Sequence, residues 1–288
     1  MKGSINGKTK AICLLGNPVE HSFSPYIHNY GFDKLSINCV YVNHKVEDEH
    51  LKAAVEGLKV LGYLGCNVTY PHKVRIMEYL DELSEEARLI GAVNTVKNQD
   101  GKLIGYNTDG MGFVKGLLRK GIDLNGKKIC MLGAGGAAKS IAVALAIHFD
   151  CRIEICNRSF ENPKKILDVI NNIKKGHEGR HQYVTPAELD TSTVDILINC
   201  TPVGMAPNKE VIPFGENITF HENLMVSDLI YHPFETALLK KAKSFGCGVH
   251  HGLDMLIDQG ILAFEIWTGE KLEFESLKNL LWEILYKK

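Results

Sequence analysis

The sequence predicts an α/β protein of two domains, an N-terminal α/β domain and a second domain built on a parallel sheet, with an active-site cleft between them. Short apolar runs alternate with longer stretches of helical periodicity along the whole chain. With 288 residues, of which 45% are hydrophobic, the chain is long enough to bury two cores. In residues 127–146 an apolar strand pattern passes through a glycine turn into a helix pattern.

In the first half of the chain, four apolar runs predict strands, at residues 11–15, 39–46, 63–69 and 92–97. Between them, residues 48–62 repeat Leu51, Val55 and Leu58 at helical spacing, which predicts an amphipathic helix that covers a sheet.

Beyond residue 110 the apolar runs become nearly continuous, which is typical of parallel strands buried on both faces. They lie at residues 128–133, 152–157, 195–200, 224–230 and 248–251. Residues 171–181 have a loop composition. The last two helical patterns, 253–269 and 274–288, have wide apolar faces that need a sheet to cover. We therefore expect one domain of residues 1–108 with 253–288 packed back on it, and a second of residues 109–252.

Composition narrows the choice of partner. The net charge is −1 and the pI about 6.9, so we expect no nucleic-acid or membrane partner, and a small molecule is favoured. The N-terminus lacks the apolar core of a signal peptide. Eight cysteines without a C-x-x-C pair favour reduced thiols and a cytoplasmic location, and no histidine spacing predicts a metal site. A monomer and a homodimer both remain open.

The glycine turn predicts a dinucleotide site. Gly133, Gly135 and Ala138 match G-x-G-x-x-G/A, the fingerprint of Rossmann-type domains. The turn and helix start, which also include Ala134, Gly136 and Ala137, offer free backbone N–H groups to a pyrophosphate. Glycines that serve only the geometry of the turn are the alternative.

The next strand decides between cofactors. A site for NAD usually has Asp or Glu at its end, to accept from the ribose 2′-hydroxyl. Here residues 152–156 are followed by Asn157, Arg158 and Ser159, whose donors suit a 2′-phosphate. NADP is therefore favoured, with NAD as a weaker alternative, and a merely solvated Arg158 remains possible.

The first predicted domain carries polar groups where its strands end. Ser22 and Ser24 precede Pro25, which can open a helix, and two hydroxyls at a helix start can hold a carboxylate. Ordinary N-capping by Ser24 is the alternative.

Further polar residues are expected at or just beyond other strand ends. They are Thr69, Lys73, Asn94, Asn107 and Asp109. Each alone can be turn chemistry. Ligands of open α/β sheets, however, lie beyond the carboxyl ends of the strands. Together these hydroxyls, amides, one ammonium and one carboxylate suit a small polyhydroxylated carboxylic acid.

Nine segments in this order resemble the shikimate dehydrogenase family. They are "GNPVEHSFSPYIHN", "NVTYPHK", "GAVNT", "GYNTDGMGF", "GAGGAA", "NRS", "NCTPVGM", "VSDLIY" and "GLDMLIDQG". The resemblance implies reduction of 3-dehydroshikimate by NADPH in aromatic amino-acid biosynthesis. It also implies that Ser22 and Ser24, with Tyr231, hold the substrate carboxylate. The ring hydroxyls would fall to Thr69, Lys73, Asn94, Asp109 and Gln259, and the nicotinamide pocket to Leu229 and Gly252.

The chain departs from the family pattern at two places. Where NADP-using relatives commonly have Thr and a second Arg, it has Ser159 and Asn162, so the phosphate grip would be weaker and dual NAD/NADP use is possible. Lys164 and Lys165 could substitute, although Glu161 opposes them. Asp254 occupies a position near the nicotinamide where many relatives have Gly.

Lys73 and Asp109 are the expected catalytic pair. A carbonyl that accepts hydride gains negative charge on oxygen, so a positioned acid must supply a proton. Lys73 is the one ammonium among these polar residues, and Asp109 would orient it; a structural ion pair is the alternative. A quinate-using, NAD-linked relative and a non-catalytic ligand sensor are the competing functions.

Overall fold

The computed structural model describes residues 5–174 and 179–287, and their contacts divide the chain into two compact units. The first comprises the residues up to Thr108 together with those from Gln259 onward, and the second comprises Asp109–Asp258. Of the predicted loop 171–181, residues 175–178 lie outside the described residues. No helix in the described ranges is long and apolar enough to cross a membrane.

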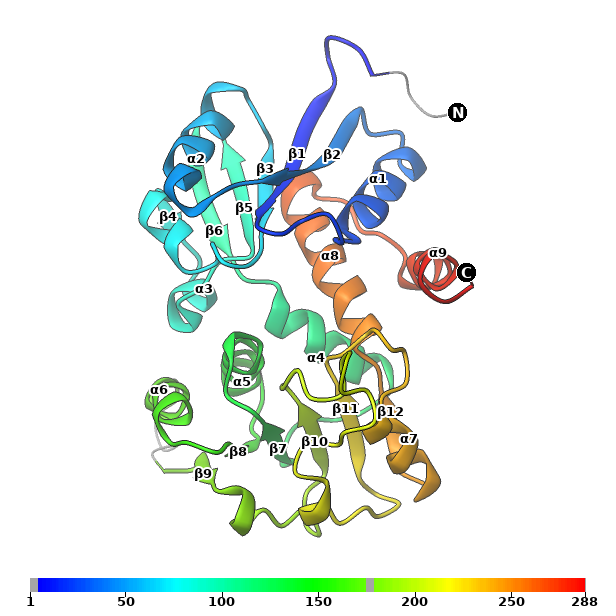
Figure 1. Cartoon of the computed structure of the whole chain (residues 1–288). Helices are drawn as coiled ribbons and strands as arrows, with labels where there is room; N and C mark the ends of the chain where they lie inside the picture. Colours follow the sequence, from blue (N-terminus) through cyan, green and yellow to red (C-terminus); the bar gives the residue numbers. More distant parts are fainter. Residues whose placement is uncertain (1–4, 175–178, 288) are drawn as a thin grey trace. The chain divides into compact units, whose positions relative to one another are not determined.

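The first unit contains a mixed six-stranded sheet (Figure 1). Its order is β2 (Cys39–Lys45), β1 (Lys10–Gly16), β3 (Gly65–Val68), β5 (Thr95–Gln99), β6 (Lys102–Tyr106) and β4 (Glu82–Leu83). The first three are parallel, whereas β5 runs antiparallel to β3 and β6 antiparallel to β5. The strand expected at 92–97 begins only at Thr95, because the Val93 amide bonds instead to the carbonyl of Lys73.

Helices cover both faces of this sheet. The predicted amphipathic helix is α2 (Leu51–Val60), which starts after a short 3₁₀ turn (Asp48–His50) and packs Leu51, Val55 and Leu58 on one face. α1 (Ser24–Lys34) contacts β2 on the other face, where Trp267 of α8 (Gly252–Thr268) donates to the Val96 carbonyl at 2.8 Å. η2 (Arg75–Tyr79), α3 (Glu85–Ile90) and α9 (Phe274–Tyr286) complete the unit.

The second unit contains a fully parallel six-stranded sheet, as its apolar runs predict. Its order is β12 (Gly248–His250), β11 (Met225–Asp228), β10 (Ile196–Asn199), β7 (Lys128–Leu132), β8 (Arg152–Cys156) and β9 (Gln182–Val184). This Rossmann-type sheet confirms the predicted fold class. The sequence pattern did not predict β9, and in the first unit it did not predict β4 or β6.

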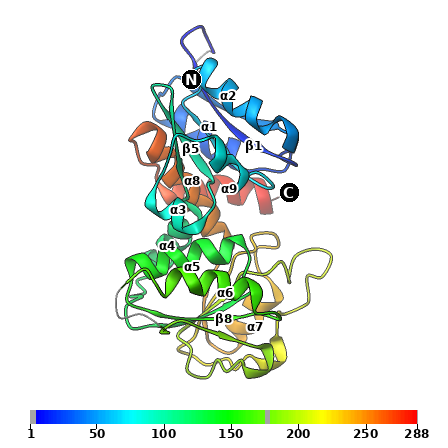
Figure 2. The same ribbon diagram turned by 90° about the vertical axis from the view of Figure 1, so that its left-hand side faces the viewer.

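Helices of the second unit separate its strands along the chain. α4 (Asp109–Arg119), α5 (Gly136–His148) and α6 (Glu161–Ile170) lie on the same side of the sheet in Figure 2. α7 (Ala237–Ser244) and the short turns η3 (Pro186–Glu188) and η4 (Gly215–Asn217) complete the unit with the start of α8. α4 and α5 pack so closely that a side chain at Gly110 would overlap the backbone of Ser140.

Candidate active site

A pocket of about 410 Å³ in the second unit brings the glycine turn and the end of β8 together. From the predicted residues it is lined by Gly133, Ala134, Gly135, Asn157 and Arg158. Gly136, Ala137 and Ser159 are not among its lining residues. The rest of the lining is Asn162, Cys200, Thr201, Pro202, Val203, Val211, Ile212, Pro213 and Phe214.

The glycine turn has the geometry that a phosphate group needs. Gly133 has a φ of +96°, which favours glycine, and its amide donates to the Cys156 carbonyl at 2.8 Å. A Cβ at Gly135 or Gly136 would meet nothing within 4 Å, so the backbone there is open to a ligand. α5 begins at Gly136 and presents its free N–H groups and positive dipole end at this turn.

The residues that directly follow β8, Asn157, Arg158 and Ser159, carry hydrogen-bond donors and no carboxylate. Asn157 and Arg158 line the pocket. Asn157 donates from Nδ2 to the carbonyl of Ser159 at 2.9 Å, which tightens the turn, and Arg158 is exposed. Asn162 lines the same pocket from the first turn of α6. This arrangement suits a 2′-phosphate better than a free 2′-hydroxyl.

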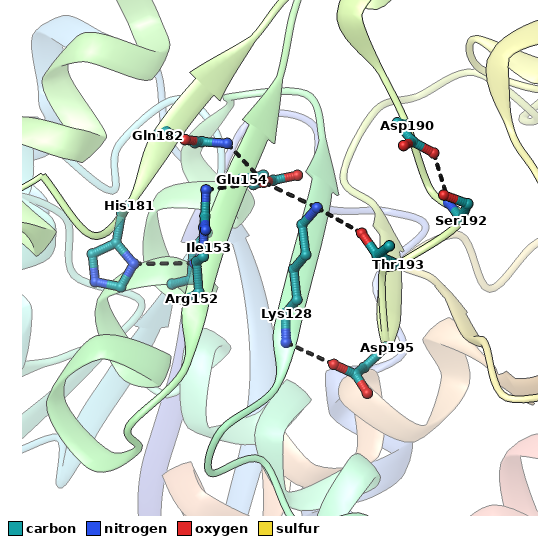
Figure 3. Close-up of polar contacts among 10 residues, drawn as sticks. All are labelled: Lys128, Arg152, Ile153, Glu154, His181, Gln182, Asp190, Ser192, Thr193 and Asp195. Carbon is teal, nitrogen blue, oxygen red and sulfur yellow. Dashed lines mark hydrogen bonds and ion pairs between the residues drawn. The ribbon is translucent and has the colours of Figure 1, made fainter.

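The carboxylate of β8 itself belongs to a different cluster. Glu154 is buried in mid-strand, and its Oε1 accepts from Nε2 of Gln182 at 2.7 Å and lies 3.2 Å from Nζ of Lys128 (Figure 3). The guanidinium of Arg152 adds a second cation, 3.6 Å from the same oxygen. Because these partners compensate its charge inside the sheet, Glu154 does not serve as the ribose-binding acid.

Leu229 and Gly252, which the resemblance assigns to the nicotinamide pocket, lie next to each other in the second unit. A Cβ at Gly252 would overlap the carbonyl group of Leu229, so glycine permits the two backbones to approach. Two residues on, Asp254 is buried in the first turn of α8, with Oδ2 3.9 Å from Nε2 of His250. A carboxylate suits that position because it faces the positive end of the helix dipole.

In the first unit, the polar residues gather at one edge of the sheet for a reason that the sequence did not reveal. Thr69, expected as the last residue of its strand, directly follows β3. Asn94 directly precedes β5 and Asn107 directly follows β6. Because β5 is antiparallel to both β3 and β6, its start lies beside their ends, with Thr95 opposite Asn67 and Tyr106. All three residues therefore reach the same edge.

Ser22 and Ser24 lie at the start of α1, but Ser24 does not cap the helix. Phe23 is the N-cap residue and makes no side-chain capping bond, while the Ser24 amide donates to Oγ of Ser22 at 3.3 Å. The buried Tyr41 belongs to a polar network of the same unit, in which its hydroxyl donates to Oδ1 of Asn67 at 2.8 Å. The N-capping alternative is therefore wrong, because Ser24 is the first residue of α1 and its amide bonds to Ser22.

The amide of Asn94 is fixed in that network. Its Nδ2 donates to Oγ1 of Thr108 at 2.9 Å, and its Oδ1 accepts from the Thr108 amide at 2.9 Å. The Asn94 carbonyl accepts from Nδ2 of Asn67 at 3.0 Å, which ties it back to Tyr41. The backbone of the half-buried Lys73 lies beside this network, because its carbonyl accepts from the amide of Val93, the residue before Asn94, at 2.8 Å.

The remaining predicted residues lie on the connecting helices and in the second unit. Asp109 is the first residue of α4, immediately after Thr108, and Tyr231 follows the end of β11. Gln259 is the residue of α8 at which the first unit resumes, and the next residue, Gly260, packs against Ile27 of α1. In the described ranges, no cluster of His, Cys, Asp and Glu side chains could hold a metal ion.

Comparison with known proteins decides the family. Over 277 residues the chain is 46% identical to a protein of Methanocaldococcus jannaschii named shikimate dehydrogenase (NADP(+)), covering 96% of this chain and 98% of the relative. The chain belongs to the shikimate dehydrogenase family. Family models match residues 14–96, as a shikimate dehydrogenase substrate binding domain, and residues 252–281, as a shikimate 5′-dehydrogenase C-terminal domain.

Two solved structures of shikimate dehydrogenases share the fold over nearly the whole chain. One, in complex with NADP⁺, is 45% identical, has a TM-score of 0.92 and covers 99% of each chain. The other, from Listeria monocytogenes in complex with shikimate and NAD, is 36% identical with a TM-score of 0.90, covering 98% of this chain and 99% of that one.

Sequence reasoning assigned no role to several residues that the structure places at these sites. Asn67 and Thr108 lie within segments that resemble the shikimate dehydrogenase family, beside Thr69 and Asp109, so their amide and hydroxyl were available signals. Cys200–Val203 belong to such a segment too. Val211–Phe214 has no periodicity or polar signature, and only the tertiary structure shows that it lines the pocket.

Proposed function

We propose that the protein is a shikimate dehydrogenase that reversibly reduces 3-dehydroshikimate to shikimate with NADPH, a step of chorismate and aromatic amino-acid biosynthesis. The carrying observation is the pocket of the second unit, in which a glycine turn meets Arg158 without an acid directly after β8. The first unit supplies hydroxyls, amides and an ammonium on one sheet edge, which suits a polyhydroxylated carboxylate. Residues 1–108 and the C-terminal helices would form the substrate domain, and the Rossmann-type unit the NADP domain.

The residues present fit a dinucleotide. The pyrophosphate would lie on the turn at Gly133–Gly136, where the open backbone and the start of α5 offer N–H groups. Arg158, with Asn157 and Asn162, would hold the 2′-phosphate. Leu229 and Gly252 would line the nicotinamide side. When bound, the nicotinamide supplies hydride to the carbonyl carbon and accepts it in the reverse direction.

The protein's own part in the chemistry is binding and proton transfer. Ser22, Ser24 and Tyr231 would hold the substrate carboxylate, and Thr69, Asn94 and Gln259 the ring hydroxyls. The ammonium of Lys73 would give a proton to the carbonyl oxygen as negative charge develops there, and the neutral amine would take the hydroxyl proton in oxidation. Asp109 would orient Lys73 and accept from a neighbouring hydroxyl.

The cysteines support a cellular location for the enzyme. Eight free thiols, six of them buried, fit a reducing compartment, and we assign the enzyme to the cytoplasm. The partners would be small molecules, with the chain acting as a monomer or a homodimer.

Formation of NADPH from NADP⁺ and shikimate tests the proposal. Purified protein should produce NADPH in proportion to enzyme concentration, and the reaction should reverse with 3-dehydroshikimate. A protein that binds both ligands without turnover would instead be a ligand sensor.

A further inference from the structure

Asp228 is a buried carboxylate at the end of β11 that accepts three hydrogen bonds. Its Oδ1 accepts from the Ile230 amide at 3.0 Å and from Nδ2 of Asn199 at 3.0 Å. Its Oδ2 accepts from the hydroxyl of Thr236 at 2.7 Å. Only 1% of the residue is exposed, so these donors replace water around the charge.

Asn199, at the end of the neighbouring strand β10, uses its whole amide group. Nδ2 donates to Asp228 and also to the Val203 carbonyl at 3.2 Å. Oδ1 accepts from the amide of Thr201 at 3.0 Å and from its hydroxyl at 2.7 Å. Two donors and two acceptors exhaust the bonding capacity of the side chain, so its orientation is fixed.

Thr201 connects the side chain of Asn199 to the glycine turn. Its hydroxyl accepts from the Val203 amide at 3.2 Å, which shapes residues 200–203, all of which line the pocket. Its methyl group packs so closely that a Cβ at Gly133 would lie 2.7 Å from Cγ2 of Thr201. The ends of β11, β10 and β7, which are neighbours in the sheet, are thus linked from Asp228 to Gly133.

We propose that Asn199 and Asp228 are positioning residues that hold the pocket wall at residues 200–203 against the glycine turn and thereby set the affinity for the dinucleotide. The proposal rests on the proposed NADP site. Neither residue lines the pocket, so both act through Thr201 and Val203.

Charge makes the link testable. In Asn199→Asp a carboxylate of the same size would face Asp228 and the Val203 carbonyl, both of which are acceptors. Two carboxylates in contact raise the pKa of one of them, so at lower pH a shared proton would restore the bond. Cys200 is the other titratable group that faces Asp228, and burial raises the pKa of its thiol, followed by a contribution from Asp228, so it stays protonated.

The experiment is a titration of each purified protein with NADP⁺ alone, at about pH 8 and about pH 6, with each variant's Kd divided by that of the wild type at the same pH. The titration of the ligand itself cancels in this ratio. For Asn199→Asp, the Kd should be about tenfold higher than that of the wild type at about pH 8, and the ratio should be smaller at about pH 6. Burial raises the pKa of Asp228 to about 6, so the wild type carries this charge almost fully at about pH 8 and only in part at about pH 6. Asp228→Asn should therefore give a smaller ratio than Asn199→Asp at about pH 8, and a ratio closer to one at about pH 6. The double variant should bind better than Asn199→Asp alone, because an amide again faces a carboxylate.

Thr191→Val is the matched control. Thr191 is buried in the same unit and its hydroxyl both donates to and accepts from Thr219, but it precedes β10 rather than following it. It should lower stability and leave the Kd unchanged. A ratio near one for Asn199→Asp at both pH values, or an equal loss in Thr191→Val, would overturn the inference. Wild type that binds NADP⁺ without oxidising shikimate would overturn the proposed function alone, and wild type that does not bind NADP⁺ would overturn both.

Discussion

The backbone carbonyl of Lys73 accepts a hydrogen bond from the amide of the buried Val93 at 2.8 Å. The next residue, Asn94, is itself fixed by Thr108, which immediately precedes Asp109. The proposed proton donor is therefore anchored to the segment that carries the proposed substrate-binding amide. A short backbone link of this kind restricts where the ammonium can reach, as a positioned acid requires.

Lys73→Ala should retain shikimate binding to within about tenfold and lose roughly 10²–10⁴-fold in kcat, the usual range for a general acid–base group. Steady-state kinetics with saturating NADP⁺ measure both quantities. Lys102→Ala, which removes an ammonium paired with Glu82 in the same unit, is the control and should leave both unchanged. A rise in KM alone would mean that Lys73 only binds substrate.

Arg158→Ala should raise KM for NADP⁺ and leave the kinetics with NAD nearly unchanged. A charged hydrogen bond contributes about 1.5–3 kcal/mol, or roughly 10–150-fold, and Asn162 in place of a second arginine places this enzyme toward the low end. Arg152→Ala, at the opposite end of β8, should not alter this preference. Equal losses with both cofactors would show that Arg158 acts on the shared adenosine.

Gly252→Ala should destabilise the protein by about 1–3 kcal/mol and lower activity, because the added methyl overlaps the backbone of Leu229. Chemical unfolding measures the difference. Gly57→Ala in α2 is the matched control: its Cβ would meet nothing within 4 Å, so the variant should gain roughly 0.5–1 kcal/mol. A Gly252→Ala protein as stable as the wild type would show that the two backbones can separate.

His28→Phe should make the first unit less sensitive to acid. His28 is fully buried, stacked 4.5 Å from Tyr41, and burial lowers its pKa to about 3. Between about pH 6.5 and pH 3, His28 is therefore protonated in the unfolded chain but neutral in the folded chain. Because the unfolded chain binds more protons in this range, the free energy of unfolding falls as the pH falls. Near pH 4 this costs the wild type about 3 kcal/mol relative to neutral pH.

Unfolding of the wild type and His28→Phe at about pH 7 and about pH 4.5 isolates this contribution, since every other group is shared. Phenylalanine suits the site because Phe264 and Trp267 also surround the ring. An identical pH dependence in both proteins would mean that His28 titrates normally.

Much of the fold could be predicted because it depends on local pattern. The continuous apolar runs of the second unit specify buried parallel strands, and the segment from Lys128 through Gly133 to Ala138 specifies a strand, a turn and a helix start. The turn has a φ of +96° at Gly133, which favours glycine, so the residue type itself indicates the conformation.

The rest depends on contacts distant in sequence. Nothing near Asn94 shows that β5 runs antiparallel to β3, although this direction is what brings Asn94 to the edge beside Thr69. Val211–Phe214 lines the pocket of the second unit only because the chain between β10 and β11 folds back toward Gly133. Tyr41 of β2 reaches Asn67 of β3 although β1 lies between the two strands in the sheet.

Initial rates with shikimate and with quinate, each with NADP⁺ and with NAD, test the central claim most directly. Quinate has a saturated ring and an extra hydroxyl on the carbon that bears its carboxylate, so it needs room beside Ser22 and Ser24. The γ-hydroxyls of these serines would crowd that space. We predict the highest kcat/KM for shikimate with NADP⁺. A kcat/KM for quinate equal to or above that for shikimate, or a preference for NAD, would contradict the account.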